Sequence, residues 1–337
     1  MPTLADIAKI SGVGVMSVSR VVNGTRKVSR ETEEKVRKAI SRIGYEPNEA
    51  ARMLKGHRAR VLGLVVPELA DPFFAICANA IQEAAREAGY MTLMVACGHN
   101  VAVERQQVEL MLRRKIAGLI VIPSSRENDF YSTFLEQKVP IISVDRPLEN
   151  METDTLVVDN REAAIQAVEH LQSHGHRNIL CLTEEEIVFT TLERLAGYNE
   201  AMLTQKLQPR VLVIGSTAGS VRESLPALLN STPTITAIFA VADVLALEAL
   251  RELRRLKVQI PEQIAFIAFD DFDAATLMTP TITVAAQPVA ELGHTAVSLL
   301  LERIKSGSTD APRRVVLKTS LLIRESCGCG ILAKTSK

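Results

Sequence analysis

Two segments near the start of the chain have short helical patterns, Thr3-Leu4-Ala5-Asp6-Ile7-Ala8 and Ser17-Val18-Ser19-Arg20-Val21-Val22-Asn23-Gly24. In the first segment, Thr3 and the acidic residue three positions later have the spacing of a capping box, which begins a helix. Glycines at positions 12 and 14 separate the two helices, since glycine adopts the backbone angles of a sharp turn. A third helix is expected from Ser29 to about Gly44. Three short helices with a glycine turn predict a helix-turn-helix unit.

Charge is distributed unevenly along the 337 residues. Residues 1–60 contain 13 Lys and Arg and 6 Asp and Glu, so this head has a net charge of +7. The whole chain has 39 residues of each sign, so the remainder has 26 basic and 33 acidic residues, a net of −7. A basic head on an acidic body indicates that the head meets a polyanion and the body does not.

From Val61 onward, short apolar runs rich in β-branched residues alternate with stretches of helical length. This alternation predicts parallel sheets that are covered by helices on both faces. Ten such runs are more strands than a single sheet usually holds, so two α/β lobes are expected. The lobes are placed at about 60–160 and 161–290, and residues 290–330 are expected to return to the first lobe. The expected runs are Val61–Val66, Met91–Ala96, Leu119–Ile122, Ile141–Val144, Leu156–Val158, Ile179–Leu182, Val211–Ile214, Ile238–Ala240, Ile264–Phe269 and Val315–Leu317.

The composition is that of a globular protein, with 47% hydrophobic and 23% charged residues. No apolar stretch is long enough for a membrane span, and the first residues do not have the pattern of a signal peptide. The five cysteines are an odd number, and Cys77, Cys97 and Cys181 lie in apolar runs. This pattern favours reduced thiols, so a cytoplasmic location is expected.

Further motifs follow the head segments in order along the chain. In the head they are Val28-Ser29, Thr32, Gly44-Tyr45-Glu46-Pro47-Asn48 and Ala50-Ala51-Arg52-Met53-Leu54. In the body they are Asp71-Pro72-Phe73-Phe74, Val144-Asp145-Arg146-Pro147, Val158-Asp159-Asn160, Gly175-His176-Arg177, Arg194-Leu195-Ala196-Gly197-Tyr198, Phe269-Asp270-Asp271 and Ile323-Arg324-Glu325-Ser326-Cys327. Together they resemble the LacI/GalR family of bacterial transcriptional regulators over almost the whole chain.

The resemblance implies an all-α helix-turn-helix head, residues 1–46, and a hinge helix and linker, residues 47–59. It also implies a two-lobed α/β body, residues 60–330, with the type I fold of periplasmic binding proteins and parallel sheets. In the head, Arg20 is suited to a bidentate contact with guanine, and Val15 and Met16 to a thymine methyl group. The full set of expected DNA-binding residues is Thr3, Val15, Met16, Ser17, Ser19, Arg20, Asn23, Ser29, Thr32, Tyr45, Asn48, Ala51, Leu54 and Lys55.

By the same resemblance, residues 48–55 form a hinge helix on DNA, and Leu54 inserts into the minor groove. A helix this short is marginal in water without DNA. Insertion kinks the duplex and needs two symmetric copies, which predicts a homodimer on a pseudo-palindromic operator.

Polar residues after the strands predict a ligand site, since such sites lie beyond the carboxyl ends of parallel strands. The family resemblance adds Gln287 and favours a sugar or sugar derivative as effector. The expected effector-binding residues are Phe73, Phe74, Asp145, Arg146, Asp159, Arg194, Asp243, Asp270 and Gln287. For Asp159, a helix-capping role is equally favoured. Ala242 stands where the family usually has asparagine, and Glu184 lies where it has glycine, so either the ligand differs from a plain hexose or the cleft has changed.

No enzyme motif, cofactor site or metal site is predicted. His170 and His174 have a helical ligand spacing, but a solvated helix end is the favoured interpretation. Cys327-Gly328-Cys329 has no second pair of thiols and is interpreted as inert rather than as a soft metal site. The Glu184-Glu185-Glu186 run is interpreted as solvated, although it follows a strand, where cleft residues often lie. The alternatives to an effector-controlled repressor are a cytosolic sugar-binding receptor, an enzyme of sugar or nucleoside metabolism, and a regulator controlled by a protein partner.

Overall fold

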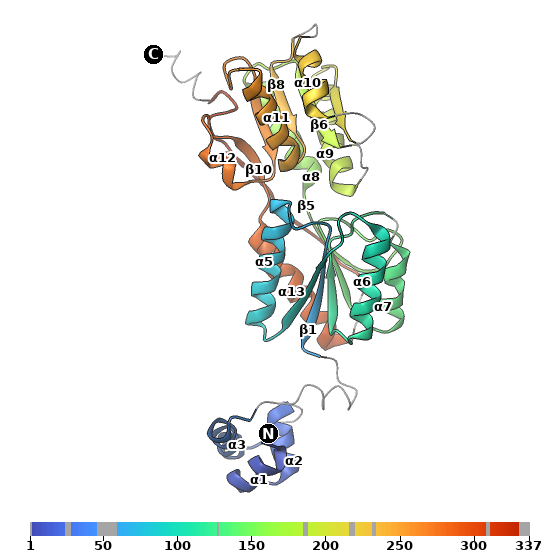
Figure 1. Ribbon diagram of the computed structural model, residues 1–337, viewed down its shortest axis with the longest axis vertical. Helices are drawn as coiled ribbons and strands as arrows, with labels where there is room; N and C mark the ends of the chain where they lie inside the picture. Colours follow the sequence, from blue (N-terminus) through green and yellow to red (C-terminus); the bar gives the residue numbers. More distant parts are fainter. Residues whose placement is uncertain are drawn as a thin grey trace. The chain divides into compact units, whose positions relative to one another are not determined.

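The computed structural model describes residues 2–23, 28–45, 59–126, 128–184, 188–215, 220–230, 234–307 and 311–329. The chain divides into two units, Met1–Ala59 and Arg60–Lys337 (Figure 1). The predicted contacts of Asn48, Ala51, Leu54 and Lys55 with DNA lie outside the described residues, as does the side chain of Asn23.

The first unit contains three helices, α1 (Leu4–Ser11), α2 (Val15–Asn23) and α3 (Arg30–Ile43). The predicted capping box is present, since the Thr3 hydroxyl accepts the Asp6 N–H and the Asp6 carboxylate accepts the Thr3 N–H. Ser29 caps α3, and Gly12 and Gly44 end α1 and α3 with the positive φ angles predicted for glycine. One residue from each helix forms the centre of the core: Ile7, Val18 and Val36.

The first sheet of the second unit has the strand order β11-β5-β4-β3-β1-β2, and every pair is parallel. Its strands are β1 (Val61–Val66), β2 (Met91–Ala96), β3 (Gly118–Val121), β4 (Ile141–Val144), β5 (Asp154–Val158) and β11 (Arg314–Leu317). Helices α5 (Pro72–Glu87) and α13 (Val289–Ser306) pack on one face. Helices α6 (Val101–Arg113) and α7 (Ser132–Glu136), with the 3-10 turn η1 (Asp129–Tyr131), cover the other face.

The second sheet has the order β12-β10-β9-β8-β6-β7. Its strands are β6 (Ile179–Glu184), β7 (Arg210–Ile214), β8 (Ala237–Ala240), β9 (Ala265–Phe269), β10 (Thr283–Ala286) and β12 (Ser320–Leu322). All pairs are parallel except β10 with β12. The accompanying helices are α8 (Asn160–Ser173), α9 (Phe189–Thr204), α10 (Val221–Leu229), α11 (Asp243–Arg255) and α12 (Asp273–Leu277).

The chain passes between the lobes three times, after β5, after β10 and after β11 (Figure 1). Helix α13 and strand β11 return to the first lobe, as the sequence predicts. The prediction that residues 290–330 all return there is wrong for the final part, because β12 pairs with β10 in the second lobe. The Ser326 side chain fixes this segment there by accepting the Thr283 N–H at 2.8 Å and donating to the Phe266 carbonyl at 2.6 Å.

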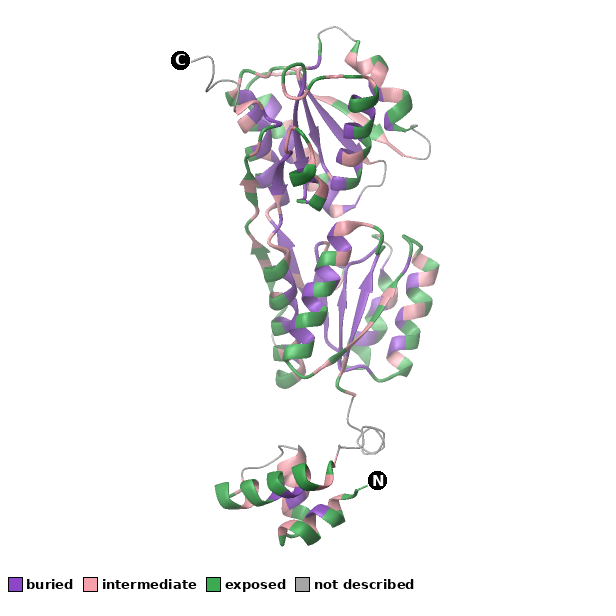
Figure 2. Ribbon diagram, turned by 60° about the vertical axis from the view of Figure 1, so that its left-hand side comes forward, coloured by how far each residue is buried: buried purple, intermediate pink, exposed green. Residues whose placement is uncertain are grey.

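The central strands of both sheets are buried, whereas the edge strands β2, β7, β11 and β12 and the outer faces of the helices are partly or fully exposed (Figure 2). The five cysteines are free thiols. Among the described residues, no helix has the length and apolar character that a membrane span requires.

Candidate functional site

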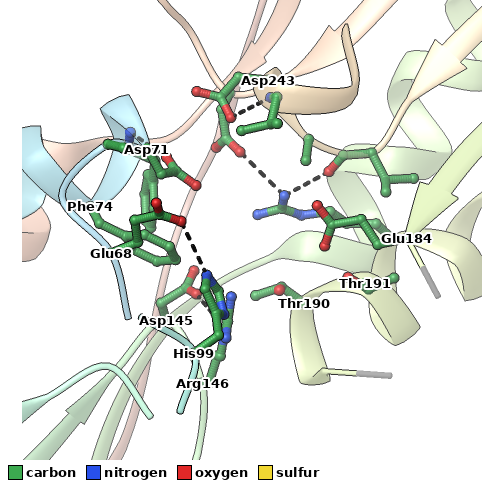
Figure 3. Close-up of a pocket in the computed structure, with 17 residues that line it drawn as sticks. Glu68, Asp71, Phe74, His99, Asp145, Arg146, Glu184, Thr190, Thr191 and Asp243 are labelled. Atoms are coloured by element: carbon green, nitrogen blue, oxygen red, sulfur yellow. Dashed lines mark hydrogen bonds and ion pairs between the residues drawn. The ribbon is translucent and has the colours of Figure 1, made fainter. Parts of the chain in front are cut away.

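A pocket of about 300 Å³ lies between the two lobes and is lined by residues from both (Figure 3). The first lobe contributes Glu68, Ala70, Asp71, Phe73, Phe74, His99, Asp145 and Arg146. The second contributes Glu184, Thr190, Thr191, Arg194, Val241, Ala242, Asp243, Val244 and Asp270. The volume suits a small molecule rather than a polymer.

Two aspartates occupy equivalent positions in the two lobes. Asp145 follows β4 and Asp270 follows β9, and both have left-handed backbone angles, with φ of 66° and 70°. Their amide groups donate across the sheet to Leu156 and Ala285, both at 2.9 Å. These bonds hold an uncommon conformation for a non-glycine residue, of the kind that gathers at functional sites. Each aspartate thereby projects into the pocket from the carboxyl end of its strand.

Arg194 is a buried cation of the second lobe, and several contacts orient its guanidinium group. Nε donates to Asn160 Oδ1 at 2.7 Å, and Nη1 donates to the Val241 carbonyl at 2.8 Å and to Asp270 Oδ2 at 3.3 Å. The guanidinium carbon lies 3.6 Å from the ring centroid of Phe269. Because these contacts fix the guanidinium group, its N–H donors have a fixed orientation toward a ligand.

The segment from Arg194 to Tyr198 explains why this sequence places the guanidinium there. A Cβ atom at Gly197 would lie 2.3 Å from the Arg161 carbonyl oxygen, so glycine permits the close packing of α9 on α8. The Tyr198 hydroxyl lies 2.8 Å from the Ile179 carbonyl and accepts the Arg210 N–H at 2.8 Å, which ties α9 to β6 and β7. Both contacts fix the helix on which Arg194 lies.

The pocket contains more carboxyl groups than cations. Six carboxyl groups line it, from Glu68, Asp71, Asp145, Glu184, Asp243 and Asp270, whereas its arginines are Arg146 and Arg194. Figure 3 shows Asp71 and Asp145 facing the same space as Glu184 and Asp243 from the other lobe.

Burial and mutual repulsion raise the pKa of several of these carboxyl groups. Burial, followed by the charges of Asp270 and Asp71, raises the pKa of Asp243 to about 7. Burial and the charges of Asp270 and Asp145 raise the pKa of Asp71 to about 6, against the hydrogen bond from the Phe73 N–H. Burial also raises the pKa of Asp145. One oxygen of Asp145 and one of Asp243 lack a hydrogen-bond partner among the described residues, which leaves acceptors for a ligand.

The structure brings together seven of the nine residues expected to bind the effector. These are Phe73, Phe74, Asp145, Arg146, Arg194, Asp243 and Asp270. Gln287 is buried and absent from the pocket lining, and its amide donates to Asp270 Oδ1 at 2.6 Å, so it orients Asp270.

The assignment of Asp159 to the effector site is wrong. Its Oδ1 accepts the Thr319 N–H at 2.8 Å and the Thr319 hydroxyl at 2.9 Å, and Lys318 lies 3.1 Å from Oδ2. Asp159 therefore links two of the segments that cross between the lobes. It is also absent from the pocket lining.

Sequence reasoning missed several pocket residues. Asp71 lies in the Asp71-Pro72-Phe73-Phe74 motif, and its side chain caps α5 at an N-terminus that reaches the pocket. Glu184 ends β6 at the pocket, so the solvated interpretation of its acidic run does not hold for this residue. Glu68, His99, Thr190 and Thr191 lie in loops or at a helix start, where the sequence carries no periodic signal.

In the head, α2 turns two apolar side chains outward. Met16 is 71% exposed and Val15 is 49% exposed, whereas Val18 on the opposite face is buried in the core. Arg20 lies one turn beyond Met16, with Nη2 3.6 Å from the Met16 sulfur. An exposed apolar face with an adjacent guanidinium fits contact with base edges better than solvation.

Other predicted DNA contacts in the head have structural partners. Thr3 caps α1, and the Ser29 and Thr32 hydroxyls lie 2.8 Å apart at the start of α3. Both caps are exposed, at helix N-termini that favour phosphate. Ser17 and Ser19 are half-buried on α2, and Tyr45 packs against the head core.

Comparison with known proteins agrees with this architecture. Residues 3–48 match the model for bacterial regulatory proteins of the lacI family, and residues 59–325 match the model for periplasmic binding proteins and the sugar binding domain of the LacI family. The chain belongs to the LacI family. The HTH-type transcriptional regulator DegA of Bacillus subtilis is 31% identical to this LacI-family protein, covering 96% of this chain and 97% of its own.

Two solved structures share the fold of this LacI-family protein. The transcriptional regulator CelR–cellobiose complex is 30% identical, with a TM-score of 0.71, and covers 97% of this chain and 100% of its own. The Lac repressor dimer bound to operator and the anti-inducer ONPF is 24% identical, with a TM-score of 0.77, and covers 97% and 99%. The protein is a DNA-binding transcriptional regulator, and its relatives are regulators rather than enzymes, as the sequence predicts.

Proposed function

We propose that this regulator is a cytoplasmic repressor that binds a pseudo-palindromic operator as a homodimer. A small molecule in the pocket between the lobes controls its affinity for DNA. The observation that carries the proposal is the pocket itself, where Asp145 and Arg146 of one lobe meet Arg194 and Asp270 of the other. The five free thiols support a reducing compartment.

The DNA-binding part of the proposal rests on α2. Its exposed Val15 and Met16 offer contacts to thymine methyl groups, and Arg20 beside them offers two parallel donors to guanine. The capped starts of α1 and α3 and the hydroxyls of Ser17 and Ser19 would position the phosphates. Leu54 would enter the minor groove, which requires a second subunit to complete the kink.

The acidic pocket restricts the chemistry of the effector. Carboxylates accept hydrogen bonds from hydroxyl and ammonium groups but repel phosphates and carboxylates. We therefore infer a polyhydroxylated effector, a neutral sugar or an amino sugar, and not a sugar phosphate. Phe74 lines the pocket, and its ring packs against that of Phe73, with the two ring centroids 5.4 Å apart. Phe74 would lie against the apolar face of the sugar ring.

Control of DNA binding would follow from the angle between the lobes. Opposed carboxyl groups from the two lobes repel each other in the ligand-free state, and a ligand that donates hydrogen bonds to both favours the closed arrangement. Such a ligand shifts the equilibrium only by its preference for one state. Asp159 and Thr319, which join two crossing segments, lie where the hinge must bend.

Thermal unfolding with a panel of metabolites tests the effector class. Neutral sugars and amino sugars are added to one set of samples and sugar phosphates to another. Stabilisation by a member of the first set is expected, and it should be lost in Asp145→Ala but kept in Asp273→Asn, which changes an exposed carboxylate of α12. Stabilisation by phosphates alone, or equal stabilisation of both variants, would overturn the assignment.

A further inference from the structure

Three potential metal ligands meet in the second lobe, outside the lining of the effector pocket, and a fourth lies beside one of them. Cys329 Sγ lies 3.1 Å from His174 Nε2 and 3.4 Å from His170 Nε2, and the ligand atoms of these three residues all lie within 4.8 Å of one another. The Cys327 sulfur lies 3.3 Å from that of Cys329. None of the four lines the pocket between the lobes.

The fold, rather than the sequence, brings the two pairs together. His170 lies in the last turn of α8 and His174 is the C-cap residue that follows the helix, and their ring centroids lie 4.6 Å apart. The two cysteines follow β12, about 155 residues later, in the segment that returns to the second lobe. Taken separately, each pair has a plain structural interpretation. Together they form the two-histidine, two-cysteine donor set of a tetrahedral zinc site.

The imidazole of His174 is oriented as a metal ligand requires. Its Nδ1 lies 2.8 Å from the His170 carbonyl oxygen, so Nδ1 carries the proton and donates it. Nε2 is then a bare acceptor, and it is the atom that faces Cys329. Ligating histidines usually donate their second ring nitrogen to a carbonyl or carboxylate in this way.

The three separations that involve Cys329 are close to those around zinc. Bond lengths of about 2.3 Å to sulfur and about 2.0 Å to nitrogen place two sulfurs of a tetrahedron about 3.8 Å apart and a sulfur and a nitrogen about 3.5 Å apart. The observed separations of 3.1, 3.3 and 3.4 Å are a few tenths of an ångström shorter. Small rotations of these side chains would therefore open the three separations to the required size.

We propose that His170, His174, Cys327 and Cys329 bind one zinc ion in a structural site. Thiolate and imidazole ligands select zinc or monovalent copper over magnesium and calcium. With four protein ligands the coordination sphere is closed, so the ion holds the structure together and carries no catalytic water.

A bound ion would join the last described segment of the chain to α8. The opposite end of that helix carries Asn160, which orients Arg194 in the effector pocket. The segment itself continues from β12, which follows the third crossing between the lobes. Zinc would therefore stabilise the lobe that holds Arg194 and Asp270 without contacting the effector.

Metal content and cobalt spectroscopy of the full chain, prepared without a histidine tag and under reducing conditions, test the site. We expect one zinc ion per chain. Replacement by cobalt should give the intense visible absorption of a tetrahedral ion together with sulfur-to-metal charge transfer. Competition with monovalent copper shows which soft ion binds more tightly, and retention of copper but never zinc would overturn the choice of ion.

Variants at the ligands decide whether these residues hold the ion. Cys329→Ser and His174→Ala should each lower zinc affinity by more than the roughly 10–100-fold typical of a lost supporting group. His294→Gln changes an exposed histidine of α13 and should leave binding unchanged. The DNA affinity of each variant, measured without zinc, confirms that the variant is folded. Absence of zinc binding, equal binding by all variants, or a Cys327–Cys329 disulfide in the reduced preparation would overturn the proposal.

Discussion

Asp243→Asn should stabilise the protein at alkaline pH and have a smaller effect at acidic pH. The pKa of Asp243 rises from 3.8 to about 7 on folding because the carboxyl group is buried near Asp270 and Asp71. Between these values the folded state binds more protons than the unfolded state, so raising the pH favours unfolding. A difference of about 3 in pKa corresponds to about 4 kcal/mol of stability lost by pH 8. Asparagine keeps the acceptor for the Val244 N–H, at 2.7 Å in the native protein, and carries no charge.

Urea unfolding of the two proteins, followed by circular dichroism at pH 5 and pH 8, measures this effect. The variant should unfold at clearly higher urea than the native protein at pH 8, by up to about 4 kcal/mol, with a much smaller difference at pH 5. Asp273→Asn, an exposed change in the same lobe, should alter neither midpoint. The same effect of Asp243→Asn at both pH values, or no effect at pH 8, would contradict a raised pKa of Asp243 in the folded protein.

Three further substitutions test other parts of the account. Arg20→Ala should weaken binding to the specific operator by about 1–3 kcal/mol and relax the preference at one base pair. Fluorescence anisotropy on operators with single base substitutions measures both effects, and unchanged affinity would show that Arg20 does not contact a base. Leu54→Ala should weaken specific binding much more than non-specific binding, and equal losses on the two DNAs would refute insertion into the minor groove. Arg194→Met should destabilise the body by about 3–5 kcal/mol, because it leaves Asp270 buried without its cation. Adding Asp270→Asn to Arg194→Met should restore much of that stability without restoring effector binding. If the double variant stays as unstable as Arg194→Met, the unpaired charge of Asp270 is not the cause of the loss.

The head and most of the strands could be predicted because their signals are local. Thr3 and Asp6 form a capping box within four residues, and the apolar runs of the parallel strands are bounded by polar turns. The sequence pattern does not predict strands β10 and β12, for a physical reason. Thr283–Ala286 is a run of small residues, and Ser320–Leu322 is a three-residue edge strand whose antiparallel pairing depends on a distant partner.

The effector pocket was predictable only in part. Asp145 and Asp270 follow recognisable strands, so the rule that ligands lie beyond the carboxyl ends of strands located them. Asp159 also follows a strand, but its carboxylate accepts a hydrogen bond from the Thr319 N–H, which lies in another segment that crosses between the lobes. The meeting of His170 and His174 with Cys327 and Cys329 depends on where β12 pairs. No local pattern reveals that pairing.

Selection of genomic DNA fragments by the purified protein, at low and at moderate salt, distinguishes sequence-specific dimeric binding from binding driven by charge alone. We expect enrichment of an inverted repeat that survives the added salt, because contacts from α2 to bases add to those with phosphate. With Arg20→Ala, enrichment of the same repeat should weaken and the preference at one base pair should be lost. Binding that weakens uniformly with salt and enriches no symmetric sequence would contradict a dimeric, sequence-specific regulator.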